Sequence, residues 1–180
     1  MPPAETTTKL KKKFRLLLYA ALLGVGLCAC SNIDCPLDNI VVMTCNLYST
    51  EDDTTYTMTD TLTITAAGTD SVLLNRAQGI TSFALPVSYN RAADTLLLHF
   101  SDANGRRAVD SLIYTHSNFS HFENLDCPAS IFHNIGQVRW TSHALGVFPL
   151  TIDSVAIIRG LIDYDDVENL RIYLRSTASE

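Results

Sequence analysis

From Ile40 onward, apolar and polar residues alternate with a period of two, and no stretch shows the 3.6-residue period of an amphipathic helix. The clearest segment is 55–65, where threonine occupies every odd position and mostly apolar residues occupy the even ones. Threonine is β-branched and polar, so one face suits a sheet open to water while the other faces a core. Asp60 interrupts the apolar face, which predicts a bulge or a strand end there. The pattern predicts an all-β domain.

The expected strands are short and are separated by turn signals. Their ranges are 40–48, 55–65, 71–75, 80–88, 95–101, 106–116, 130–143, 150–163 and 170–174. Pro86 limits its segment to a sheet edge or a bend. Asn104-Gly105 predicts a hairpin closed by a tight primed turn. About eight or nine such strands predict an immunoglobulin-like antiparallel β-sandwich, and a small β-barrel is the alternative.

The N-terminal residues have a different composition. A lysine cluster at 9–13 precedes the apolar run 14–27, which is shorter than the roughly 18 to 20 residues that cross a bilayer. This order is typical of a secretory signal. The next small-residue box, Leu27-Cys28-Ala29-Cys30, resembles the lipobox of bacterial lipoproteins, with Cys30 as the acylated N-terminus. Cys28 is the competing acceptor, but it would place a leucine before the cut; an ordinary secretory signal is the alternative.

These features divide the chain into a lipoprotein signal peptide (1–29), a short lipidated tether (30–34) and a single β-sandwich domain (35–180). All lysines lie within the signal, so the mature chain is clearly acidic, and the whole chain already has a net charge of −6. An acidic surface argues against nucleic acid as a partner. We expect a bacterial outer-membrane location through Cys30, with periplasmic and outward orientations both open.

Three further cysteines, Cys35, Cys45 and Cys127, suit an oxidising compartment and leave one thiol over after one disulfide. Cys45 falls on the apolar face of the first strand, where a free cysteine behaves as a small hydrophobe. We therefore expect Cys35 to pair with Cys127, although sequence does not settle connectivity. The bridge would close about ninety residues and contribute on the order of 4 kcal/mol in the chain-entropy model.

A tripeptide of Asp, then Ser or Thr, then Leu or Val occurs five times in the mature chain. Its second residues are Thr61, Ser71, Thr95, Ser111 and Ser154. One interpretation is structural, because Asp and Ser form turns through side-chain hydrogen bonds and then precede β-formers. The other is modification, because the tripeptide resembles the O-glycosylation sequon of exported Bacteroidota proteins. A glycan has to sit at the surface, and these five hydroxyls are the candidate acceptors.

Two groups of polar residues contain the side-chain types that bind metal ions. The first is His116, His121, Glu123, Asp126 and His133, and the second is Asp163, Asp165, Asp166 and Glu168. The first lacks zinc-motif spacing and the second lacks the residue order of a calcium loop, so no metal site is predicted. A serine elbow, a phosphate-binding loop and a dinucleotide fingerprint are also missing. We therefore predict no cofactor, no catalytic residues and no enzymatic activity.

Several short motifs resemble a family of Bacteroidota lipoproteins of unknown function. They are Cys35-Pro36, Asp60-Thr61-Leu62, Leu73-Leu74-Asn75-Arg76, His121-Phe122-Glu123, Asp126-Cys127, Phe132-His133 and Leu170-Arg171-Ile172-Tyr173-Leu174. The resemblance covers nearly the whole mature chain. It implies a compact envelope lipoprotein with no assigned activity, and it supports the pairing of Cys35 with Cys127.

Two functions remain open from the sequence. The first is a non-enzymatic, lipid-anchored envelope protein with a structural or protein-interaction role. The second is a glycan-binding accessory module, which requires Trp140 and tyrosines such as Tyr89 or Tyr164 to be exposed together on one surface. A metal-binding envelope protein is a remote alternative. The expected partners are the membrane, through the lipid anchor, and another envelope protein or a glycan.

Overall fold

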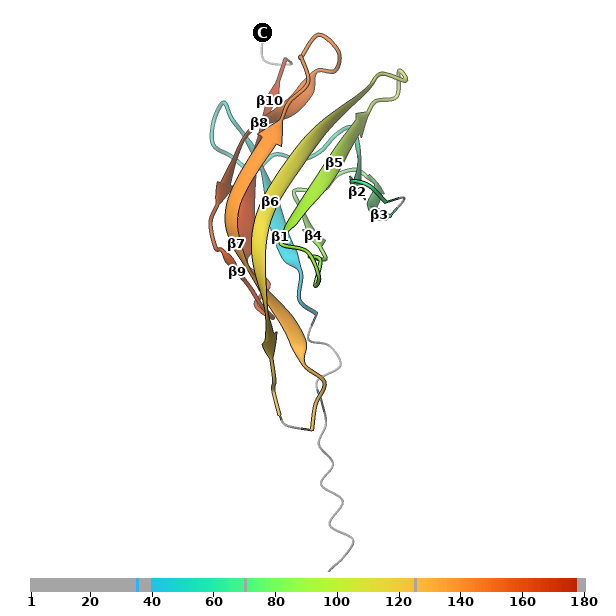
Figure 1. The fold of residues 1–180 in the computed structure, drawn as a ribbon. Helices are drawn as coiled ribbons and strands as arrows, with labels where there is room; N and C mark the ends of the chain where they lie inside the picture. Colours follow the sequence, from blue (N-terminus) through green and yellow to red (C-terminus); the bar gives the residue numbers. More distant parts are fainter. Residues whose placement is uncertain (1–34, 36–39, 70, 125, 178–180) are drawn as a thin grey trace, which may run out of the picture. The chain divides into compact units, whose positions relative to one another are not determined.

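The computed structural model describes residues 35, 40–69, 71–124 and 126–177, and within these ranges it is all-β (Figure 1). Ten strands form two sheets, with the orders β4-β1-β10-β8 and β3-β2-β5-β6-β7-β9. Their bounds are β1 Met43–Ser49, β2 Thr61–Ala66, β3 Val72–Ala77, β4 Ser82–Leu85, β5 Ala93–Ser101, β6 Arg107–His121, β7 Ser130–Thr141, β8 Leu150–Ile157, β9 Leu161–Ile162 and β10 Glu168–Ser176. No helix in the described ranges is long and apolar enough to cross a membrane. The predicted β-sandwich is confirmed.

The strand pairing is antiparallel with one exception. β1 and β10 lie side by side in parallel, with Cys45 opposite Leu170 and Leu47 opposite Ile172. The sequence predicted a wholly antiparallel sandwich, which is wrong for this pair. The direction of a strand next to a distant segment depends on where the intervening chain crosses between the sheets, and residue alternation does not record that.

The core lies between the two sheets and is built from the inward residues of alternating strands. From the four-stranded sheet it takes the fully buried Met43, Cys45, Leu47, Leu170 and Ile172, and from the six-stranded sheet Leu62, Ile64, Leu98, Phe100, Leu112 and Tyr114. Burying one such large apolar side chain contributes roughly 1.5 to 3 kcal/mol. Cys45 is free and buried, as expected, and this burial raises the pKa of its thiol above the usual range.

Several expected strands have different bounds in the structure, among them the segment 55–65 and the strand β6. The segment 55–65 is a strand only from Thr61, because Asp60 lies in a bend. The preceding residues form an isolated bridge between Thr55 and Tyr48 and loop hydrogen bonds, such as Met58 N–H to Ile80 O at 2.9 Å. The strand end predicted at Asp60 is therefore present, but the long threonine face is not. Expectation and structure also differ at β6, which continues to His121 beyond the predicted end at His116.

The segment 150–163 forms two strands in different sheets. β8 ends at Ile157 in the four-stranded sheet, and β9 begins at Leu161 and pairs with β7 in the six-stranded sheet. Gly160 lies at the crossing, and its carbonyl accepts a bond of 2.8 Å from Ile135 N–H. A Cβ at Gly160 would come within 3.2 Å of the Ile135 carbonyl oxygen, so a larger residue would push the two segments apart.

The hairpin between β5 and β6 is confirmed, but its turn differs from the expected primed type. Gly105 has a φ of 83°, whereas Asn104 is not among the non-glycine residues with positive φ. A primed turn of type I′ needs both. Asp102 organises the turn instead, because its Oδ1 accepts hydrogen bonds of 2.9 Å from the backbone N–H groups of Asn104 and Arg106.

One buried carboxylate joins the two sheets. Asp110 of β6 is fully buried, and its oxygens accept four hydrogen bonds: from His143 N–H and Nδ1 at 2.7 Å, from Thr151 Oγ1 at 2.9 Å and from Ile152 N–H at 2.8 Å. Two of these donors belong to β8, the edge strand of the opposite sheet. Because a buried carboxylate is tolerated only when its oxygens are bonded, Asp110 fixes how β8 lies against β6.

We predict that Asp110→Ala lowers the free energy of unfolding by about 3 kcal/mol or more, because two backbone N–H groups and the Thr151 hydroxyl lose their acceptor. Urea unfolding followed by circular dichroism measures this loss. Asp153→Ala is the matched control, since Asp153 begins another copy of the same tripeptide but forms only a partly exposed ion pair with Arg175 at 3.3 Å. It should lose less than about 1 kcal/mol. Equal losses in both variants would contradict the role assigned to Asp110.

Candidate functional site

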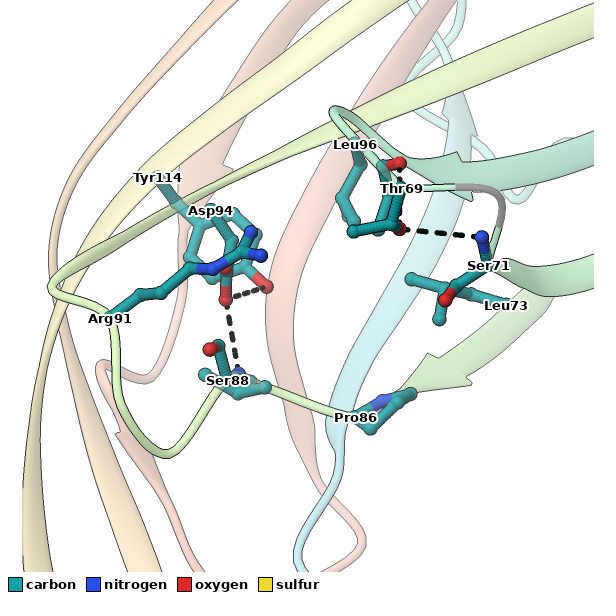
Figure 2. A pocket seen from close by; sticks show the side chains of 11 residues that line it. Thr69, Ser71, Leu73, Pro86, Ser88, Arg91, Asp94, Leu96 and Tyr114 are labelled. Carbon is teal, nitrogen blue, oxygen red and sulfur yellow. Dashed lines mark hydrogen bonds and ion pairs between the residues drawn. The ribbon is translucent and has the colours of Figure 1, made fainter.

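A small pocket opens between the β2–β3 turn and the β4–β5 connection. Its apolar wall consists of Ala66, Leu73, Pro86, Val87 and Leu96, and its polar residues are Thr69, Ser71, Ser88, Arg91, Asp94 and Tyr114. Figure 2 shows Arg91, Asp94, Ser88 and Tyr114 gathered on one side and Thr69, Ser71 and Leu73 on the other. The pocket places one carboxylate and one guanidinium above an apolar wall.

Asp94 is the centre of the polar side. Its Oδ2 accepts hydrogen bonds from Ser88 N–H at 3.0 Å and from the Tyr114 hydroxyl at 3.5 Å, and it lies 3.2 Å from His116 Nε2. Its Oδ1 is 3.8 Å from Arg91 Nη1. The carboxylate therefore holds the β4–β5 connection against β6. The same carboxylate and the burial of the ring raise the pKa of Tyr114, with burial the larger cause.

Next to Asp94 in this network, the side chain of Asn118 links two buried histidines to the segment between β4 and β5. Its Nδ2 donates to the backbone carbonyls of Ser88, Tyr89 and Arg91 at 2.7 to 3.1 Å. These three acceptors fix the orientation of the amide, so Oδ1 points toward the histidines and accepts from the Nδ1 atoms of His116 and His133, each at 2.7 Å. Both rings accordingly carry a proton on Nδ1.

His133 is neutral at pH 7. Burial and, to a lesser extent, the neighbouring His116 lower the pKa of His133 to about 4, while Asp94 acts in the opposite direction. The two rings meet edge to face, with their centroids 5.6 Å apart. Asp94, His116, Asn118 and His133 thus form one hydrogen-bonded chain that runs from the pocket across β6 to β7.

The geometry of the pocket suits a structural role, in which its polar groups hold the segment between β4 and β5 in place, better than ligand binding. Its volume of about 210 Å³ is below the range of roughly 300 to 1,000 Å³ that is typical of ligand pockets. The Ser88 hydroxyl, the nearest candidate nucleophile, bonds Asn90 Oδ1 at 3.1 Å and contacts neither histidine. Local sequence does not reveal this network. Asp94 lies in a repeated tripeptide, but no sequence pattern shows that Asn118 lies beside Ser88.

The five candidate zinc ligands lie in two different parts of the structure. His116 and His133 lie inside the sandwich, whereas His121 is half-exposed and 3.4 Å from Glu123 at the end of the β6–β7 hairpin. Asp126 is exposed in the following loop. Among the described residues, no group of three or more histidine, cysteine or acidic side chains is arranged to hold a metal ion.

The carboxylates near β9 form ion pairs or hydrogen bonds with other side chains. Arg159 pairs with Asp163 at 2.7 Å and with Asp165 at 3.0 Å. Glu168 forms a two-point ion pair with Arg171, whose guanidinium also stacks 4.2 Å from the Tyr48 ring. The Thr44 hydroxyl donates to Asp166. These carboxylates stabilise the ends of β1, β9 and β10.

The five candidate glycan acceptors differ in exposure. Thr61 is buried, and its Oγ1 accepts a hydrogen bond of 2.6 Å from Gln78, so it offers no surface for a glycan in the folded chain. Thr95 and Ser154 are partly buried, and Ser111 bonds the Thr141 hydroxyl. Ser71 is exposed at the rim of the pocket. The aspartates of two copies, Asp94 and Asp110, have the structural roles described above.

The aromatic residues required for a glycan platform lie apart. Trp140 is half-buried near the end of β7, where its Nε1 donates to the Asp153 carbonyl at 3.0 Å and joins the two sheets. The Tyr164 hydroxyl donates to Ser130 near the start of the same strand. These two places on β7 are ten residues apart, roughly 33 Å along a strand. Tyr89 is exposed in the β4–β5 connection.

The remaining predicted residues are the cysteines. Cys35 and Cys127 form a disulfide, with their Cα atoms 5.6 Å apart, as expected. The bridge attaches the chain before β1 to the loop between β6 and β7. Cys30, the predicted lipidation residue, and the segments 1–29 and 30–34 lie outside the described residues, so those predictions stand as they were.

The network and every strand except β1 and the end of β10 fall within a region that matches a protein-family model. Residues 61–174 match the Family of unknown function (DUF6452). The chain belongs to this family. The DUF6452 match begins at the first residue of β2 and ends within β10, so it contains Asp94, Asp110 and both buried histidines. No curated protein and no solved structure matches the chain.

We predict that His133 makes stability depend on pH. Its folded pKa is lowered to about 4 from an ordinary value of 6.5. Below pH 6.5 the unfolded chain therefore binds a proton that the folded chain excludes, and stability is lost as pH falls from 6.5 toward 4. Between pH 7 and pH 4.5, the wild-type protein should lose on the order of 2 kcal/mol more than His133→Phe.

Urea unfolding at the two pH values measures the difference. The half-exposed His121 provides the matched control, and His121→Gln should lose as much stability as the wild-type protein. If His133→Phe also loses as much as the wild type, the buried ring of His133 does not carry the pH dependence.

Proposed function

We propose that this chain is a bacterial envelope lipoprotein, acylated at Cys30, whose β-sandwich acts without catalysis as an interaction or structural module close to the membrane. The observation that carries the proposal is the Cys35–Cys127 disulfide. It holds the domain by a residue only five positions after the predicted lipidated cysteine. A bridge also suits an oxidising compartment, which the signal-like N-terminus would reach.

A partner protein is best accommodated at the β3 edge. β3 is the outermost strand of the six-stranded sheet, and Val72 at its start is 54% exposed. The opposite edge strand of this sheet, β9, has only two residues. In the other sheet, backbone groups at the edge of β8 already bond the side chains of Asp110 and Trp140. An exposed edge pairs with a strand from another chain through its backbone groups. The glycan-binding alternative has no comparable support, because its aromatic residues are separated.

We predict that Cys30→Ser releases the protein from membranes, because acylation at this residue is the proposed anchor. Fractionation of cells that express the full chain, followed by detection in the membrane and soluble fractions, measures this release. Cys28→Ser is the matched control, two residues away in the same segment, and it should stay in the membrane fraction. Retention of Cys30→Ser in the membranes would contradict the anchor, and release of Cys28→Ser alone would move the anchor to Cys28.

We also propose O-glycosylation of the tripeptide that contains Ser71, since its side chain is the exposed one among the candidates. Intact-mass measurement of protein purified from its native host should show a mass above that of the acylated polypeptide. Ser71→Ala should remove this extra mass, whereas Thr61→Val should retain it because Thr61 is buried. A native mass equal to that of the acylated polypeptide would exclude the modification.

A further inference from the structure

The end of the β6–β7 hairpin extends beyond the other strands of its sheet (Figure 1). β5 pairs with β6 only as far as Thr115, and β9 pairs with β7 only at His133 and Asn134. From Phe119 and Phe132 outward, β6 and β7 pair only with each other, up to His121 opposite Ser130. Among the described residues, no other strand therefore pairs with this end of the hairpin.

This end carries a group of aromatic rings that we call the aromatic tip, defined as Phe119, His121, Phe122, Phe132 and Tyr164. His121 stacks on Phe132 with centroids 4.3 Å apart, and Phe119 and Tyr164 meet Phe132 edge-on at 5.9 and 4.9 Å. These contacts bury Phe132 on the outer face of the hairpin. Phe119 remains 45% exposed and Phe122 59% exposed, so the tip presents apolar surface to the outside.

The disulfide holds this surface close to the predicted lipidated cysteine. Cys127 belongs to the loop of the same hairpin, and its bridge brings Cys35 to the aromatic tip. Only Ser31 to Asp34 separate Cys35 from Cys30. The five Cα–Cα steps from Cys30 to Cys35 span at most about 18 Å, less than half of the roughly 40 to 45 Å thickness of a bilayer with its headgroups. An acyl chain on Cys30 would therefore hold the aromatic tip near the membrane surface.

We propose that the aromatic tip rests on the lipid bilayer, with the rings of Phe119 and Phe122 inserted at the level of the headgroups. This inference rests on the proposed lipid anchor and adds a second contact to it. Aromatic rings favour the membrane interface. The exposed carboxylates of Glu123 and Asp126 limit the depth of the contact and favour zwitterionic headgroups, which have no net charge, over anionic ones. Lipid anchor and hairpin together orient the sandwich, with the β5–β6 turn directed away from the bilayer.

The experiment places a fluorophore on the aromatic tip. The full-length Phe122→Trp variant, purified with its lipid from membranes, is reconstituted into phosphatidylcholine vesicles whose acyl chains are brominated. Bromine quenches tryptophan only at short range. Phe122→Trp should be quenched at least twofold more than Tyr89→Trp, the matched control, whose site is exposed in the β4–β5 connection. The wild-type protein, with Trp140 alone, gives the baseline for both variants.

The outcomes separate the two proposals. If Phe122→Trp sediments with the vesicles and is quenched no more than Tyr89→Trp, the anchor stands and the aromatic tip does not touch lipid. If neither variant sediments with the vesicles and neither carries an acyl mass, the lipid anchor fails and the membrane contact fails with it. Replacement of an exposed phenylalanine or tyrosine by tryptophan keeps a large ring at the surface, so both variants should fold as the wild type does.

Discussion

The arrangement of the two sheets depends on the buried carboxylate of Asp110. It receives four hydrogen bonds from β8 and from the segment before it, while its own strand lies in the opposite sheet. A carboxylate in this position is unfavourable unless every donor is in place, so the alternative packings of β8 against β6 are disfavoured. Trp140 of β7 and Ser142, the residue just after β7, add hydrogen bonds to the same strand. Together these contacts close one side of the sandwich without strand pairing between the sheets.

Asp94 has a corresponding role on the other side of β6. Its carboxylate links the segment between β4 and β5 to Tyr114 and His116, and Asn118 continues this hydrogen-bonded network to His133. Both aspartates begin a copy of the same tripeptide, and both lie within strands rather than at the turns that the sequence suggested. In these two copies the aspartate therefore supplies a hydrogen-bond acceptor between strands and loops. The serine or threonine that follows it points to the opposite face, where exposure varies from Ser71 to Thr61.

The long β6–β7 hairpin links architecture to the proposed function. Its inner part supplies both buried histidines, and its outer part carries the disulfide and the aromatic tip. One pair of strands thus spans the distance from the core to the segment expected to carry the lipid. Because the bridge is covalent, the domain cannot move away from a membrane anchor by more than the four intervening residues allow.

The sequence by itself determined the all-β class, most strand positions and the hairpin at Gly105, because these follow from local alternation and turn chemistry. It favoured the pairing of Cys35 with Cys127 through the expected burial of Cys45, and the structure decided it. It also indicated the signal and lipobox, which depend on composition. Only the tertiary structure decided the parallel pairing of β1 with β10, the division of segment 150–163 between two sheets, and the assembly of Asp94, His116, Asn118 and His133. These features depend on contacts between residues far apart in the chain, and a period-two pattern records which face is buried but not which partner lies opposite.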